Sequence, residues 1–203
     1  MQQTLLMLHG LTGTAEMMEQ FANKISPDNC NLVIPNGTFK HEDRGYCWWH
    51  YKIKSNGNKD HKVKLTDKLL REIHESINYL IDTLPPDDKI IIGGFSQGGA
   101  MAQIMLLSEI SHRISGLILL GTRPIEEDKL REALNNLNPI PVLWMHGLED
   151  EIIAFDDSSE LVKILEEEGW EVTKIVHKKG HMIPLKLHDD VKNFVQDIFS
   201  NNA

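Results

Sequence analysis

Runs of Ile, Leu and Val recur along the whole chain and alternate with segments of helical periodicity. The apolar runs lie at 4–8, 31–35, 89–93, 116–120, 141–145 and 172–177. All but the last are nearly continuous, which is typical of strands that are buried on both faces of a parallel sheet. The segments between them predict helices at about 14–25, 66–83, 97–111, 127–137, 156–168 and 188–200.

This alternation of strands and helices predicts an α/β fold, with a mostly parallel central sheet and helices on both faces. The clearest helix is 66–83, where Leu and Ile side chains fall on one stripe before Pro85 and Pro86 end the pattern. The sequence contains no internal repeat and no linker. We therefore expect a single domain over residues 1–203.

Composition excludes several classes of protein. The 41% hydrophobic content fits a globular domain, and a formal charge of −9 provides no attraction to nucleic acid or anionic lipid. The run 4–8 lacks the flanks of a signal peptide, and no apolar run approaches the ~20 residues of a membrane helix. Because the only cysteines are Cys30 and Cys47, we expect free thiols and a cytoplasmic location.

A Gly-x-Ser-x-Gly motif carries the main chemical signal. It reads Gly94-Phe95-Ser96-Gln97-Gly98, directly after a predicted buried strand and directly before a predicted helix. Glycines two residues either side of the serine allow a sharp strand-to-helix turn, which projects the hydroxyl over the carboxyl end of the sheet. The motif predicts that Ser96 is a nucleophile.

A serine nucleophile needs a base, and the base needs an acid that orients it. Asp150 follows the fifth predicted strand and His181 follows the sixth, so both belong to loops at the same edge of the sheet. The order Ser96, Asp150, His181 is the one expected for a hydrolase of this architecture. Glu149 is the nearest competitor for the acid, but it should point the other way.

The oxyanion of such a reaction needs two backbone N–H donors. One is expected from Gln97, the residue after the nucleophile. The other is expected from Leu11, in the glycine-containing loop after the first strand. Ile152 and Met182 follow the acid and the base, and we expect them to form an apolar wall of the substrate pocket.

The segment 37–65 interrupts the alternation and is too long for a simple connection, so we expect an excursion over the sheet edge. It contains an aromatic cluster at 46–51. Trp48 and Trp49 in this cluster have two interpretations, which the sequence leaves open. They pack in the core, or they line a pocket for an acyl or alcohol group.

Taken together, these motifs resemble the phospholipase/carboxylesterase family of α/β-hydrolases, which includes acyl-protein thioesterases. The resemblance runs from His9-Gly10-Leu11 to Gly180-His181, and its most specific part is Phe95-Ser96-Gln97-Gly98-Gly99. It implies a minimal α/β-hydrolase fold with a central first strand and no large cap domain. It also implies a Ser96–His181–Asp150 triad, an oxyanion hole of Leu11 and Gln97, and no metal or organic cofactor.

The resemblance predicts hydrolysis of a carboxylic ester or thioester through an acyl-enzyme. The expected partner is a small-molecule or acylated substrate with an apolar group, without nucleic acid or a stable membrane anchor. The segment 151–154 lacks the family's usual proline, which bears on substrate preference. Alternative activities are a lactone or peptide hydrolase and a biosynthetic thioesterase, and the alternative from another class is a non-catalytic binding protein.

Overall fold

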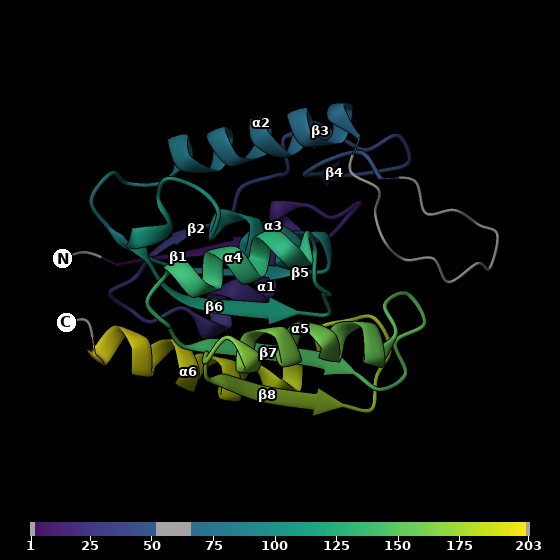
Figure 1. Cartoon of the computed structure of the whole chain (residues 1–203). Helices are drawn as coiled ribbons and strands as arrows, with labels where there is room; N and C mark the ends of the chain where they lie inside the picture. Colours follow the sequence, from purple (N-terminus) through teal and green to yellow (C-terminus); the bar gives the residue numbers. More distant parts are fainter. Residues whose placement is uncertain (1–2, 52–65, 202–203) are drawn as a thin grey trace.

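The computed structural model describes residues 3–51 and 66–201 of the chain (Figure 1). These residues form a six-stranded sheet with the order β2-β1-β5-β6-β7-β8, and every neighbouring pair of strands is parallel. Its strands are β1 (Gln3–Leu8), β2 (Asn31–Val33), β5 (Lys89–Phe95), β6 (Ile114–Leu120), β7 (Val142–Gly147) and β8 (Val172–His177). The predicted parallel sheet is confirmed, and each predicted strand overlaps an observed one.

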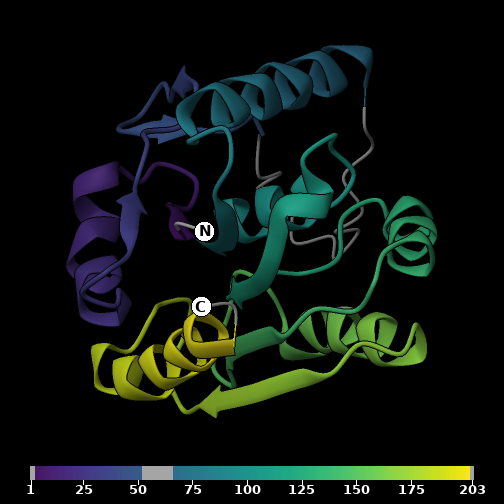
Figure 2. The ribbon, with the colours of Figure 1, turned by 90° about the vertical axis from the view of Figure 1, so that its left-hand side faces the viewer.

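Helices cover both faces of the sheet, as predicted (Figure 2). They are α1 (Ala15–Ile25), α2 (Asp67–Thr83), α3 (Gln97–Met105), α4 (Glu127–Asn136), α5 (Phe155–Glu167) and α6 (His188–Asn201). The side chains of α1 and α6 share one core with strand residues such as Leu5 and Met7. The intervening residues, such as Leu6 and Leu8, share the other core with α2 to α5. Because successive strand residues point to opposite faces, the continuous apolar runs supply both cores.

Two features differ from the prediction. The first strand lies between β2 and β5, one position from the edge rather than in the centre, because β2 is the only described strand beyond it. The helix predicted at 97–111 ends at Met105. There the Ser108 hydroxyl donates to the Met105 carbonyl at 2.7 Å, and the chain continues in tight turns to a 3₁₀ helix at Ser111–Arg113.

The excursion after β2 contains an antiparallel pair of short strands, β3 (Phe39–Lys40) and β4 (Tyr46–Cys47). The Tyr46 N–H donates to the Gly13 carbonyl at 2.9 Å, which joins β4 to the loop after β1. The excursion was predicted over 37–65, and its part at 52–65 lies outside the described residues. Within the described chain, no helix combines the length and the hydrophobicity that crossing a membrane requires.

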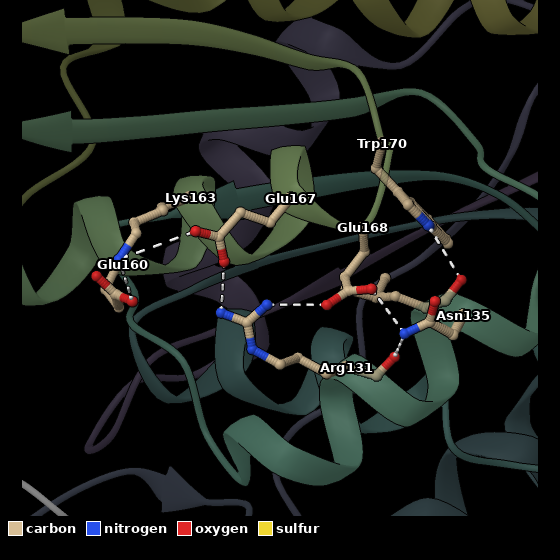
Figure 3. A network of polar contacts seen from close by, with 8 residues as sticks. Arg131, Asn135, Glu160, Lys163, Glu167, Glu168 and Trp170 are labelled. Atoms are coloured by element: carbon tan, nitrogen blue, oxygen red, sulfur yellow. Dashed lines mark hydrogen bonds and ion pairs between the residues drawn. The ribbon is translucent and has the colours of Figure 1, made fainter.

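A polar network joins α4 to the end of α5 (Figure 3). The Arg131 guanidinium donates to the carboxylates of Glu167 and Glu168 at 2.7 and 2.8 Å. Next to it, the Trp170 indole N–H donates to the Leu134 carbonyl at 3.3 Å. Because the charged groups of this network are partly exposed, it orients the two helices more than it stabilises the fold.

Candidate active site

Ser96 lies in the sharp turn between β5 and α3, as the motif predicts. Its backbone has φ 53° and ψ −114°, and its N–H donates to the Leu120 carbonyl of β6 at 2.8 Å. The two flanking positions must be glycine, because backbone atoms of other residues lie too close to leave room for a Cβ. A Cβ on Gly94 would lie 2.2 Å from the Gly98 carbonyl carbon, and a Cβ on Gly98 would lie 2.3 Å from the Leu8 carbonyl oxygen. The turn therefore holds the serine against the end of β1.

The loop after β1 passes directly beside the serine. A Cβ on Gly10 would lie 3.3 Å from Ser96 Cβ, so the backbone next to Leu11 is adjacent to the nucleophile. Thr12 has φ 62°, and the Gly13 N–H donates to the Gly10 carbonyl at 3.0 Å, which closes a tight turn. Gln97 is the first residue of α3, so its N–H has no acceptor within the helix. The two predicted oxyanion donors thus belong to the loop after β1 and to the first residue of α3, which meet at Ser96.

Asp150 and His181 contact each other, although they come from the loops after different strands. His181 Nδ1 donates to Asp150 Oδ2 at 2.7 Å, and the Asp150 side chain is almost completely buried. The other oxygen, Oδ1, accepts the N–H groups of Ile152 and Ile153, both at 2.9 Å. The carboxylate is therefore held from both sides. By contrast, its neighbour Glu149 is exposed.

The His181 ring lies against Phe95, the residue before the serine, with 4.7 Å between the ring centroids. A Cβ on Gly121 would lie 3.6 Å from His181 Cε1. Within the described residues, His181 and the Ser96 hydroxyl are not joined by a hydrogen bond. Such bonds are often long in enzymes without substrate and tighten when substrate binds.

Trp48 and Trp49 are buried, which favours their interpretation as core residues over their interpretation as pocket residues. Their exposed fractions are 0% and 3%, and both belong to the core beneath α2 and α3. The residues after β4 turn inward, because their backbone polar groups bond to the Gln97 side chain.

Ile152 and Met182, with exposed fractions of 54% and 49%, do face solvent beside the acid and the base.

A hollow of about 510 Å³ lies at the opposite end of the sheet. Its lining includes Lys89, Ile114 and Pro141, which stand where β5, β6 and β7 begin. It is thus separated from Ser96 by the length of the strands. In parallel α/β sheets the ligand side is the carboxyl end, so this hollow is not the candidate active site.

Two buried histidines, each followed by glycine, support the site loops. His9 Nδ1 donates to the Gly10 carbonyl at 2.7 Å, while its Nε2 accepts the Gly37 N–H at 2.8 Å. His146 Nε2 donates to the Ile153 carbonyl at 3.0 Å and lies 3.4 Å from Asp150 Oδ2. Burial lowers the pKa of both imidazoles. These supporting roles were not predicted from the sequence, although the repeated His-Gly dipeptide at two strand ends is a signal for them.

The sequence matches the model of a known protein family over almost the whole chain. The model of the phospholipase and carboxylesterase family matches residues 1–199. The chain belongs to the phospholipase/carboxylesterase family. It is a hydrolase of the α/β-hydrolase fold, as the motifs predicted, and residues 3–51 and 66–201 contain no large cap.

Similar proteins include acyl-protein thioesterases of fungi. This hydrolase is 29% identical to acyl-protein thioesterase 1 of Debaryomyces hansenii over 182 residues, which cover 84% of this chain and 77% of the relative. It is 25% identical to acyl-protein thioesterase 1 of Aspergillus fumigatus over 211 residues, which cover 96% of this chain and 87% of the relative.

Solved structures share the fold of this hydrolase at low sequence identity. Acyl-protein thioesterase 2 of Zea mays has a TM-score of 0.73 and 19% identity, covering 97% of this chain and 94% of that one. Esterase PE8 has a TM-score of 0.74 and 20% identity, covering 97% of this chain and 93% of that one.

We predict that the free energy of unfolding of this hydrolase falls when the pH falls from about 7.5 to about 5.5. Burial lowers the pKa of His9, His146 and His177 in the folded state. In the unfolded chain a histidine has a pKa of ~6.5. Below that value the unfolded state binds more protons, so acid favours unfolding. Urea unfolding at the two pH values measures the effect.

In the same experiment, His146→Gln should reduce the pH dependence, because glutamine keeps an N–H donor and does not titrate. The matched control is His74→Gln, at an exposed position on α2. It should keep the pH dependence of the parent protein. A free energy of unfolding that is equal or higher at the lower pH would contradict the prediction.

Proposed function

We propose that this hydrolase cleaves carboxylic esters or thioesters through an acyl-enzyme, with Ser96, His181 and Asp150 as its catalytic triad. The observation that carries the proposal is the 2.7 Å bond from His181 to the buried Asp150, beside the strained turn of Ser96. Because Nδ1 carries the proton in that bond, Nε2 is the free base of the imidazole.

In the proposed mechanism, Ser96 Oγ attacks the acyl carbon while His181 Nε2 takes the hydroxyl proton. The N–H groups of Leu11 and Gln97 donate to the oxyanion of the tetrahedral intermediate. The carbon–oxygen or carbon–sulfur bond to the leaving group then breaks, and His181 gives its proton to the departing alcohol or thiol. Water, deprotonated by His181, attacks the acyl-enzyme and releases the acid.

The proposed substrate carries an apolar acyl or alcohol group. Leu148, Ile152 and Met182 are exposed large hydrophobic residues in the two loops that hold the acid and the base. The names of the fungal relatives, acyl-protein thioesterases, support an acylated substrate. In such a site each buried methylene contributes about 0.8 kcal/mol of binding free energy.

The same triad can serve a lactone hydrolase, a peptide hydrolase or a biosynthetic thioesterase, and a panel of esters, thioesters, lactones and peptides separates these activities. A non-catalytic binding role is disfavoured because His181 is hydrogen-bonded to the buried Asp150, which is the pairing that a catalytic base requires. Cys30 and Cys47 are free thiols, which supports a reducing cytoplasm as the place of action.

Replacement of the nucleophile tests the proposal most directly. Ser96→Ala should lower kcat for ester hydrolysis by ~10⁴–10⁶ and abolish labelling by a fluorophosphonate probe. The melting temperature should stay close to that of the parent, because alanine is under the same backbone constraint as serine at positive φ. Hydrolysis above about a thousandth of the parental rate would show that the nucleophile lies elsewhere.

A second test distinguishes the two neighbouring carboxylates. Asp150→Asn should lower kcat by roughly 10³–10⁴, because the amide cannot hold the required imidazole tautomer or stabilise the imidazolium. The exposed Glu149 provides the matched control, and Glu149→Gln should leave kcat near the parental value. If the order of the two effects were reversed, Glu149 would be the acid.

A third test addresses the apolar wall. We expect kcat/KM to rise several-fold with each added methylene over short acyl chains and then to level off. Met182→Gln should flatten this dependence, because it removes apolar surface beside the base. Met17→Gln changes another exposed methionine, on α1, and should keep the dependence. Identical chain-length profiles for Met182→Gln and the parent would exclude Met182 from the pocket.

A further inference from the structure

Trp48 bonds both to the end of β1, before the loop of Leu11, and to Gln97, the first residue of α3. Its indole N–H donates to the His9 carbonyl at 2.9 Å, directly before the Gly10-Leu11 turn. Its backbone N–H donates to the side-chain oxygen of Gln97 at 3.0 Å. One residue is thus hydrogen-bonded to a group close to each proposed oxyanion donor, the His9 carbonyl near Leu11 and the side chain of Gln97.

The position of Trp48 is itself fixed by its surroundings. The residue is completely buried, and its ring lies beside the His9 ring, with 5.2 Å between the centroids. Its carbonyl accepts the hydroxyl of Ser76, from α2, at 2.5 Å. The backbone of Trp48 is thus bonded to α2 and α3, while its buried ring is packed in the core and bonded to the end of β1.

The side chains of Gln97 and His9 also bond to other residues of the excursion after β2. The Gln97 side-chain amide donates to the Trp49 carbonyl at 2.8 Å, so this side chain bonds to both tryptophan backbones. On the other side, His9 Nε2 accepts the Gly37 N–H at 2.8 Å. These bonds join segments that are far apart in the sequence. They therefore set the spacing of the two loops rather than the shape of either loop alone.

We propose that Trp48 is a positioning residue, which fixes the distance between the Leu11 and Gln97 amides and so preorganises the oxyanion hole. The inference rests on the proposed function. An oxyanion hole stabilises the transition state only when both donors lie 2.7–3.1 Å from the developing charge. A displacement of about 1 Å in one loop lowers the rate by up to about a hundredfold.

The test compares two conservative variants, Trp48→Phe and Trp170→Phe. Both remove a buried indole N–H that donates to a backbone carbonyl, and both tryptophans belong to the same core. Trp170 lies beside α4, outside the proposed site. Each variant is assayed for kcat and KM per active site titrated with a fluorophosphonate, and for inhibition by an alkyl boronic acid. The boron of the inhibitor bonds to Ser96 Oγ, and its oxygen occupies the place of the oxyanion.

Trp48→Phe should lower kcat about tenfold to hundredfold, leave KM within about twofold, and weaken boronic acid inhibition by about the same factor as kcat. Trp170→Phe should lower the melting temperature to a similar extent and keep kcat and inhibition at parental values. Equal kcat and equal inhibition for the two variants would overturn the inference, because Trp48 would then serve stability alone.

A second pair keeps the test decisive if Trp48→Phe does not fold. Gln97→Met removes the two bonds to the tryptophan backbones, and Gln103→Met changes a buried glutamine on the same helix that bonds to Gly99 and Arg123. Only Gln97→Met should lower kcat and boronic acid affinity together, and equal behaviour of the pair would overturn the inference. A parent protein that neither reacts with the fluorophosphonate nor hydrolyses esters would instead overturn the proposed function.

Discussion

The backbone of Ser96 has a positive φ, which is strained for a residue with a side chain and persists only where the surrounding structure holds it. Such a conformation costs about 1–3 kcal/mol. The bond from its N–H to Leu120 and the bond from the Ala100 N–H to its carbonyl hold the turn between two buried elements. Because Gly94 and Gly98 pack against each other and against β1, the chain has no room to relax. The direction of the hydroxyl, and with it the whole site, depends on this turn.

The loops around Ser96 are fixed by buried polar bonds between distant parts of the chain. His9 and His146 perform the same task at the ends of β1 and β7, where each bonds to backbone groups of a site loop. At His9 a neutral imidazole suits this task, because one ring nitrogen donates and the other accepts. The cost is that the loops depend on a group whose charge state changes with pH.

The architecture could be predicted from the sequence, and parts of the environment of the candidate site could not. Continuous apolar runs mark buried parallel strands, and the Gly-x-Ser-x-Gly turn carries its own structural context, so both could be predicted from neighbouring residues. The burial of Trp48 depends on bonds to Gln97 and His9, which are remote in the sequence and leave no periodic signal. At the end of α3 the N–H groups of Leu106, Leu107 and Ser108 bond to carbonyls three residues back, and the Ser108 hydroxyl bonds to the Met105 carbonyl. Such individual hydrogen bonds do not appear in a hydrophobic pattern.

The pairing of β1 with β5 has a consequence for the order of folding. Thr4 pairs with Ile90, so the first strand of the chain finds its interior neighbour only after a long intervening segment has been synthesised. Contacts between residues so distant in sequence form slowly, because the entropy of closing the loop is lost before the contacts form. Until then the apolar residues of β1 are exposed on the nascent chain, which is the condition that favours aggregation and chaperone binding.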